Sequence, residues 1–107
     1  MEIEFTTQVF KEGRTYVAYT PELDVSSCGR TEDKARLNLI EAVRLFLEEA
    51  GNMGTIDQIL EEAGYVRRRG SLEAPKLISV ERAKIPLPLA HAKTLVRDFS
   101  PGRRYLA

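Results

Sequence analysis

The sequence predicts an α+β fold in which one long helix packs across an antiparallel β-sheet. Three patterns carry this prediction. Residues 2–10 alternate between apolar and polar side chains, residues 15–20 and 25–28 are short β-prone stretches, and residues 31–50 repeat apolar side chains at helical spacing. A period of two is typical of a half-buried strand, and a period near 3.6 indicates an amphipathic helix. The expected order is β-β-β-α-β with a short second helix.

The chain is long enough for one modest hydrophobic core. Its 107 residues suit a single domain, and 43% of them are hydrophobic and 30% charged, as in globular proteins. We expect one domain over residues 1–89 and a basic tail over residues 90–107. The N-terminus does not look like a signal peptide, and no apolar run approaches the about 20 residues that span a bilayer. A cytoplasmic protein without a membrane segment is therefore expected.

Formal charge is divided unevenly along the chain, although its total is zero. Residues 1–63 hold 6 Lys or Arg and 13 Asp or Glu, a net charge of −7. Residues 64–107 hold 10 and 3, a net charge of +7. This division indicates charge complementarity within the molecule, between subunits or towards a partner. A fold whose two halves simply neutralise each other is an equally simple interpretation.

The three N-terminal strands should follow one another closely. The apolar face of the first consists of Ile3, Phe5, Thr7 and Val9. The next residues supply a turn in which Gly13 can take a positive φ, so the first two strands should form a hairpin. The second strand ends at Pro21, which cannot donate to a ladder. Leu23 should then enter the core from the turn before the third strand.

The long helix should begin at Thr31 and end at Gly51. Thr31 is a good N-cap, and Glu32 and Asp33 suit the positive end of the helix dipole. The apolar stripe expected to cover the sheet consists of Ala35, Leu39, Ile40, Ala42, Val43, Phe46, Leu47 and Ala50. Burying its large members should stabilise the fold by about 1.5–3 kcal/mol each.

Four candidate contact residues of this helix lie away from that stripe. They are Leu37, Glu41, Leu45 and Glu48. Exposed leucines are common on protein surfaces, which is the simplest explanation. The functional interpretation is a contact with a partner protein or with another copy of the chain, and we expect a homo-oligomer.

The second half of the chain has a weaker pattern. A second helix is expected over residues 55–64, with Thr55 and Gln58 forming a capping box. Residues 76–86 resemble a last strand, rich in Leu, Ile and Val, and Pro86 limits it to an edge or an end. The basic tail that follows should be partly helical or frayed.

No catalytic, cofactor-binding or metal-binding residue is predicted. His91 is the single histidine and Cys28 the single cysteine, so one chain cannot build a zinc site from them alone. A Cys-His nucleophilic pair lacks any orienting signature. Cys28 is more simply a small buried residue of a strand. The many carboxylates are best explained as a solvated face of the long helix and its cap.

One candidate for nucleic-acid binding follows the second helix. It consists of Tyr65, which could stack on a base, and of Arg67, Arg68 and Arg69. Successive side chains of a strand point to opposite faces, so these arginines need not form one patch. A solvated or salt-bridged run is the alternative.

The first half of the chain resembles the HicB family of antitoxins. The resemblance is carried by a series of loosely spaced positions, namely Tyr16-Val17-Ala18, Pro21-Glu22-Leu23, Ser27-Cys28-Gly29, Thr31, Ala35, Asn38-Leu39, Glu41-Ala42 and Phe46-Leu47. It implies a partial RNase H-like fold without enzymatic activity. It also implies a partner, the HicA toxin, a small RNA-cleaving protein whose active site the antitoxin covers.

Residues 51–107 depart from the pattern of many HicB-like proteins, which carry a C-terminal DNA-binding domain. The prolines of this region divide it into pieces too short for a helix-turn-helix. The resemblance therefore implies a short antitoxin that binds a HicA-type toxin. The alternative is a regulatory protein that binds nucleic acid through its basic half.

Overall fold

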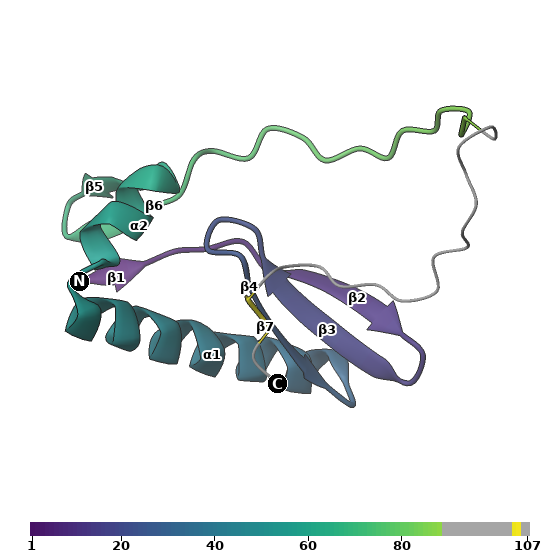
Figure 1. Ribbon diagram of the computed structural model, residues 1–107, viewed down its shortest axis with the longest axis horizontal. Helices are drawn as coiled ribbons and strands as arrows, with labels where there is room; N and C mark the ends of the chain where they lie inside the picture. The colour runs from purple at the N-terminus through teal and green to yellow at the C-terminus, as the bar shows by residue number, and fades with distance from the viewer. Residues whose placement is uncertain (89–103, 106–107) are drawn as a thin grey trace.

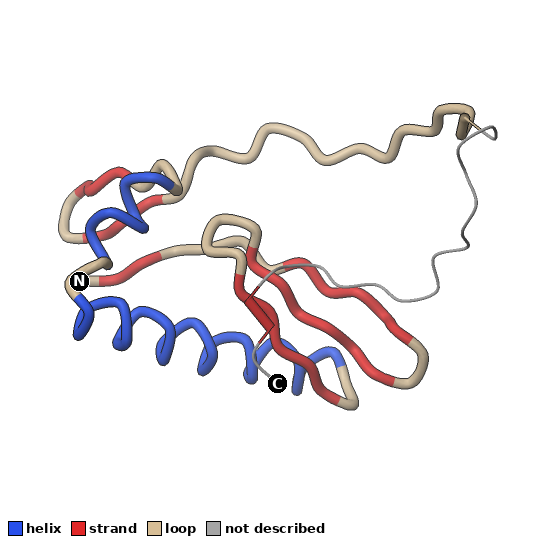
Figure 2. Tube along the Cα trace, viewed as in Figure 1, coloured by secondary structure: helices blue, strands red, loops and turns tan. Residues whose placement is uncertain are grey.

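A computed structural model describes residues 1–88 and the backbone of residues 104–105. Within these residues the chain forms two helices and two β-sheets, an α+β arrangement (Figure 1). The larger sheet has the order β2-β3-β4-β7, and the smaller one has the order β1-β6-β5. The long helix lies along the larger sheet, while the smaller sheet and the second helix gather near the end of the long helix (Figure 2).

The larger sheet begins with the predicted hairpin of β2 (Gln8–Glu12) and β3 (Thr15–Thr20). The two strands are antiparallel, from Gln8 opposite Tyr19 to Glu12 opposite Thr15. Gly13 in the turn has a φ of 62°, a conformation that glycine adopts without strain. The hairpin prediction is confirmed.

The third predicted strand is also present, as β4 (Val25–Gly29), antiparallel to β3. Leu23 enters the core from the turn, as expected, with 1% of its surface exposed. The short strand β7 (Arg104–Tyr105) pairs in parallel with β4. Cys28 is half-buried rather than buried, which corrects the sequence-based expectation.

The long helix, α1 (Glu32–Met53), starts as predicted but ends later. The Thr31 hydroxyl accepts a hydrogen bond from the Lys34 amide at 3.1 Å, which confirms the N-cap. The predicted end at Gly51 is wrong. A glycine inside a helix costs only about 1 kcal/mol, and the helix continues to Gly54, which terminates it in the left-handed conformation with a φ of 73°.

The core lies between α1 and the inner face of β3 and β4. Its buried members are Ala18, Leu23, Val25, Ala35, Leu39, Ala42, Val43 and Leu60. The predicted stripe is therefore correct in its centre. It is wrong at one edge, since Ile40 is 46% exposed. Phe46 and Leu47 pack against the core but are only partly buried. The reason is that α1 lies over β3 and β4, which leaves its flank beside β2 uncovered.

Two contacts fix how α1 sits on β4. The Asn38 side chain donates to the Cys28 carbonyl at 2.7 Å. Gly29 allows the first turn of α1 to approach closely, because an added Cβ there would lie 2.7 Å from the Ala35 amide nitrogen. Both features depend on the segment between strand and helix being short.

The N-terminal strand does not run continuously over residues 2–10, as the alternating pattern predicted. It is divided into β1 (Glu2–Ile3) and β2, and these belong to different sheets. β1 pairs in parallel with β6, with Glu2 opposite Ser71 and Ile3 opposite Leu72. The alternation itself holds, because Ile3, Phe5 and Val9 all pack against the core.

The second helix, α2 (Ile56–Glu62), is shorter than predicted. The predicted capping box is not formed. The Thr55 hydroxyl donates instead to the Ala50 carbonyl at 3.4 Å, and the Gln58 amide donates to the Glu62 carboxylate at 3.0 Å. Thr55 directly follows the end of α1, so its side chain lies within reach of the last carbonyl groups of that helix.

A hairpin of β5 (Val66–Arg68) and β6 (Ser71–Glu73) follows α2 and was not predicted. Arg69 and Gly70 form its turn with φ values of 49° and 79°. Two successive positive φ values are typical of a tight two-residue hairpin turn. A Gly in the second position was the available signal in the sequence.

The predicted strand over residues 76–86 is not formed. Residues 74–88 contain no helix or strand, and residues 75–88 are all exposed. The stretch has β-prone residues, but a strand exists only where a neighbouring strand accepts its hydrogen bonds. In Figure 1 this segment is the green stretch that leaves the body of the molecule. We call residues 76–88 the arm. Except for β7, the predicted tail over residues 90–107 lies outside the described residues.

Candidate protein-binding surface

The structure brings the four predicted contact residues of α1 into one line on its outer side. Leu37, Glu41, Leu45 and Glu48 are separated by four, four and three residues, so they lie one above the other on a helix. Leu37 is 64% exposed and Leu45 is 53% exposed. These positions lie on the side of the helix opposite Leu39, which is buried against the sheet. We call these four residues the outer stripe.

The charges around the outer stripe are mostly acidic. The Arg36 guanidinium forms ion pairs with Glu32 at 3.1 Å and Asp33 at 3.2 Å, and Arg44 pairs with Glu41 at 3.5 Å. These pairs are exposed, so each contributes at most about 1 kcal/mol to stability. Their main effect is that the arginines of α1 are already neutralised, which leaves a net acidic helix with two exposed leucines.

An apolar hollow of about 420 Å³ lies between the flank of α1 and the N-terminal segment that holds Ile3 of β1 and Phe5. It was not anticipated from the sequence, because Ile40 and Leu47 were assigned to the buried stripe. Its lining consists of Ile3, Phe5, Ile40, Val43, Arg44, Leu47 and Glu48. Glu48 thus belongs both to this hollow and to the outer stripe. The two apolar areas of α1 are neighbours on one surface.

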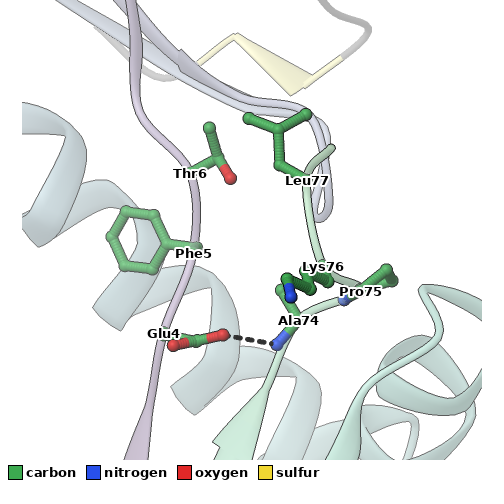
Figure 3. Close-up of a pocket in the computed structure, with 7 residues that line it drawn as sticks. All are labelled: Glu4, Phe5, Thr6, Ala74, Pro75, Lys76 and Leu77. Atoms are coloured by element: carbon green, nitrogen blue, oxygen red, sulfur yellow. Dashed lines mark hydrogen bonds between the residues drawn. The ribbon is translucent and has the colours of Figure 1, made fainter. Parts of the chain in front are cut away.

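A second hollow, of about 310 Å³, lies between residues 4–6 and residues 74–77 (Figure 3). The Ala74 amide donates to the Glu4 carboxylate at 3.0 Å across its base. A third, of about 460 Å³, lies between the edge of β2 and the start of α1, and Arg36 and Glu32 reach into its rim. None of the three hollows gathers a nucleophile with a base beside it.

Glu22 has a structural role that the sequence analysis missed. Its carboxylate accepts hydrogen bonds from the Thr6 amide at 2.8 Å, the Thr6 hydroxyl at 2.6 Å and the Thr20 hydroxyl at 3.0 Å. Burial alone would raise the pKa of this carboxyl group, but the hydrogen bonds from Thr6 and Thr20 outweigh it and hold the pKa below its ordinary value. Glu22 therefore ties the segment before β2 to the turn after β3.

Asp24 is a second carboxylate of this turn that accepts a hydrogen bond from a side chain. It accepts a hydrogen bond from the Tyr19 hydroxyl at 3.0 Å and holds a φ of 55°, which Asp tolerates better than most residues. Burial raises the pKa of Tyr19, and the hydrogen bond and charge of Asp24 raise it further. Both carboxylates thus form hydrogen bonds within the fold and are not simply solvated.

The nucleic-acid candidates are only partly brought together. Arg67 and Arg69 are exposed on the hairpin, while Arg68 forms an ion pair with Glu73 at 3.2 Å. Tyr65 packs against the core and donates its hydroxyl proton to the Glu4 carbonyl at 2.7 Å. Burial raises the pKa of Tyr65, as do the negative charges of Glu22 and Glu4. Its ring is therefore held by the fold and is not a free stacking platform.

Among the described residues, no group of three or more His, Cys, Asp or Glu side chains is placed to hold a metal ion. His91 lies outside those residues. Comparison of the chain with protein-family models, curated proteins and solved structures finds no match. In the part of the chain that the structure describes, neither helix is both long and apolar enough to cross a membrane.

Proposed function

We propose that this protein is a non-catalytic antitoxin of the HicB type, which binds a small basic RNA-cleaving toxin of the HicA type and covers its active site. The observation that carries the proposal is the outer stripe of α1, where two exposed leucines stand among carboxylates. A toxin that binds RNA phosphates presents a basic surface, and an acidic surface with apolar anchors is complementary to it.

The order of elements also supports the proposal. The antiparallel strands β2, β3 and β4 are followed by a helix that packs across one face of their sheet. We propose that these four elements form the partial RNase H-like core that the resemblance implies. Two of the residues that carry the resemblance determine how α1 packs on β4. Gly29 permits the close approach of α1, and the Asn38 side chain donates a hydrogen bond to the Cys28 carbonyl.

Cytoplasmic location belongs to the same proposal, because a toxin of this kind meets its RNA there. The acidic half of the chain should speed encounter with the toxin, and the leucines should slow dissociation. Exposed charges chiefly affect association rates, whereas buried apolar anchors chiefly affect dissociation rates.

The test is capture of proteins from the native lysate by three tagged proteins. They are the unchanged chain, the variant E41K/E48K and the control variant E61K/E62K. Both variants change the net charge by the same amount, but Glu61 and Glu62 lie on α2, away from the outer stripe. We expect the unchanged chain and the control to retain one small basic protein, and E41K/E48K to lose it. Retention by E41K/E48K, or equal loss from both variants, contradicts binding at the outer stripe.

One observation favours a second candidate function, binding of nucleic acid by the β5–β6 hairpin. Arg67 and Arg69 are exposed at its end. This alternative requires binding of RNA or DNA by the purified protein, with an affinity that falls steeply as salt is raised. R67A/R69A should then remove binding. The absence of any salt-sensitive binding by the unchanged protein would exclude this alternative.

A further inference from the structure

The apolar hollow of about 420 Å³ on the flank of α1 has the character of a binding site for a side chain. Five of the residues that line it are apolar, namely Ile3, Phe5, Ile40, Val43 and Leu47. Ile40 remains 46% exposed at its edge, so the hollow is open to an approaching protein. At protein interfaces, much of the binding energy comes from a few large side chains that fill depressions of this kind.

Both walls of the hollow are held in place by the fold. One wall is the flank of α1. The other is the segment that holds Ile3 and Phe5, in which Ile3 pairs with Leu72 of β6 and the Glu4 amide donates to the Leu72 carbonyl at 3.0 Å. In Figure 3 the Phe5 ring projects from the side of this segment that faces away from residues 74–77. Because neither wall has to be ordered on binding, more of the contact energy is retained as affinity.

The rim of the hollow carries one charge that the described residues do not compensate. The two charged residues of the lining are Arg44 and Glu48. Arg44 forms an ion pair with Glu41 at 3.5 Å, whereas Glu48 forms none among the described residues. The hollow therefore combines an apolar floor with a carboxylate at its rim. A large apolar side chain with a basic group beside it is complementary to this combination.

The hollow is also continuous with the outer stripe of α1. Leu37 and Ile40 are three residues apart on the helix, and Arg44 and Glu48 are four apart, so the members of each pair are neighbours on its surface. Glu48 belongs to both areas. A protein that covers the outer stripe therefore reaches the hollow at Glu48, which favours that protein as the occupant over an unrelated small molecule.

We propose that the hollow is the anchor site for the toxin. It receives one large apolar side chain of the toxin, and a Lys or Arg beside that side chain forms an ion pair with Glu48. This inference rests on the proposed function and makes it more specific, because it states which local chemistry the toxin must present. An apolar anchor of this kind slows dissociation, whereas the acidic charges act on association.

The affinity of the captured toxin for two matched variants tests the anchor site. Ile40→Asp places a charge in the hollow, and Val66→Asp on β5 is the control, since Ile40 is 46% and Val66 48% exposed. On charge alone, both variants should bind a basic toxin slightly more tightly. We expect Ile40→Asp instead to raise the Kd about a hundredfold, because the carboxylate would be buried against apolar atoms. Val66→Asp should not raise it.

Glu48→Gln tests the ion pair separately. It keeps the shape of the side chain and removes its charge. We expect a smaller rise in Kd than for Ile40→Asp, and a Kd that depends less on salt than that of the unchanged chain. An unchanged salt dependence contradicts the ion pair with Glu48.

A double-mutant cycle tests the chemistry of the toxin. Each large apolar residue of the captured toxin that neighbours a Lys or Arg is replaced by Ala and combined with Ile40→Ala. At the anchor the two substitutions should not be additive, since either one removes the same contact. At the other positions they should be additive. Additivity at every position overturns the proposal.

The outcomes separate this inference from the proposed function. If the unchanged chain retains no small basic protein, the proposed function fails and the anchor site fails with it. If the toxin is retained and binds Ile40→Asp as tightly as Val66→Asp, the anchor site alone is overturned. Light scattering without toxin covers the remaining occupant. If Ile40→Asp dissociates a dimer of the purified chain, a second copy fills the hollow, and the proposal is overturned.

Discussion

The substitution Gly29→Ala tests how closely α1 approaches the sheet. A methyl group at this position would lie 2.7 Å from the Ala35 amide nitrogen and 2.9 Å from both the carbonyl carbon and the Cβ of Lys34. Two of these atoms belong to the backbone of the first turn of α1, so a change of side-chain rotamer cannot relieve the contact. The helix would have to move away from β4.

The expected cost is that of overpacking a well-packed site, about 1–3 kcal/mol. Movement of the first turn would also lengthen the hydrogen bond from Asn38 to the Cys28 carbonyl, which is 2.7 Å in the structure. In a domain of this size, a loss of about 1 kcal/mol lowers the melting temperature by about 4–8 °C. Gly29→Ala should therefore melt at least several degrees below the parent protein.

Gly51→Ala is the matched control. Gly51 lies inside α1, and nothing lies within 4 Å of a Cβ added there. Replacement of an unhindered helical glycine by alanine should stabilise the protein by about 0.5–1 kcal/mol. Urea unfolding at one fixed protein concentration measures both variants. If Gly29→Ala shows no loss, or if the two substitutions change stability in the same direction, the close approach of α1 to β4 is refuted.

Three further substitutions test polar contacts of the fold by urea unfolding. Glu22→Gln should cost about 1–3 kcal/mol at neutral pH. The difference from the parent should shrink as the pH falls through the lowered pKa of Glu22, because the ionised carboxylate stabilises only the folded state above that pH. Tyr65→Phe should cost about 0.5–1.5 kcal/mol. It should also lessen the loss of stability above pH 10, where unfolded tyrosine ionises before the buried one. Asn38→Ala should cost about 1–3 kcal/mol by leaving the Cys28 carbonyl without its donor. An unchanged midpoint for any of them would contradict the corresponding contact.

The parts of the fold that the sequence predicts are those set by neighbouring residues. Thr31 caps α1 because its side chain needs only the amide of Lys34. The hairpin of β2 and β3 follows from the alternation of the strands and from Gly13 between them. The centre of the helical stripe is buried for the same reason, since residues three and four apart share one face.

The larger errors concern contacts between distant parts of the chain. The alternating residues 2–10 are divided between two sheets because Glu2 and Ile3 pair with β6, which lies some seventy residues later in the chain. Residues 76–86 have the composition of a strand, but composition cannot supply the neighbouring strand. Ile40 has helical periodicity with the core, yet it is exposed because the sheet does not extend beneath it.

The same distinction applies to the candidate surface. Leu37 and Leu45 could be assigned to the outer side of α1 because helical geometry fixes their direction. The apolar hollow beside them could not be predicted, since Ile3 and Phe5 come from the other end of the fold. The role of Glu22 could not be predicted either, because its bonds to Thr6 bridge sixteen residues.

The central claim is the proposal that the outer stripe of α1 binds an RNA-cleaving partner and inhibits its cleavage of RNA. The most direct measurement is RNA cleavage by the captured small basic protein after it has been separated under denaturing conditions and refolded. Adding back the unchanged chain should abolish cleavage at an equimolar ratio, and E61K/E62K should act equally well. E41K/E48K and L37A/L45A should require a large excess. If the captured protein cleaves no RNA, or if the variants of the outer stripe inhibit as well as the unchanged chain does, the proposed function is contradicted.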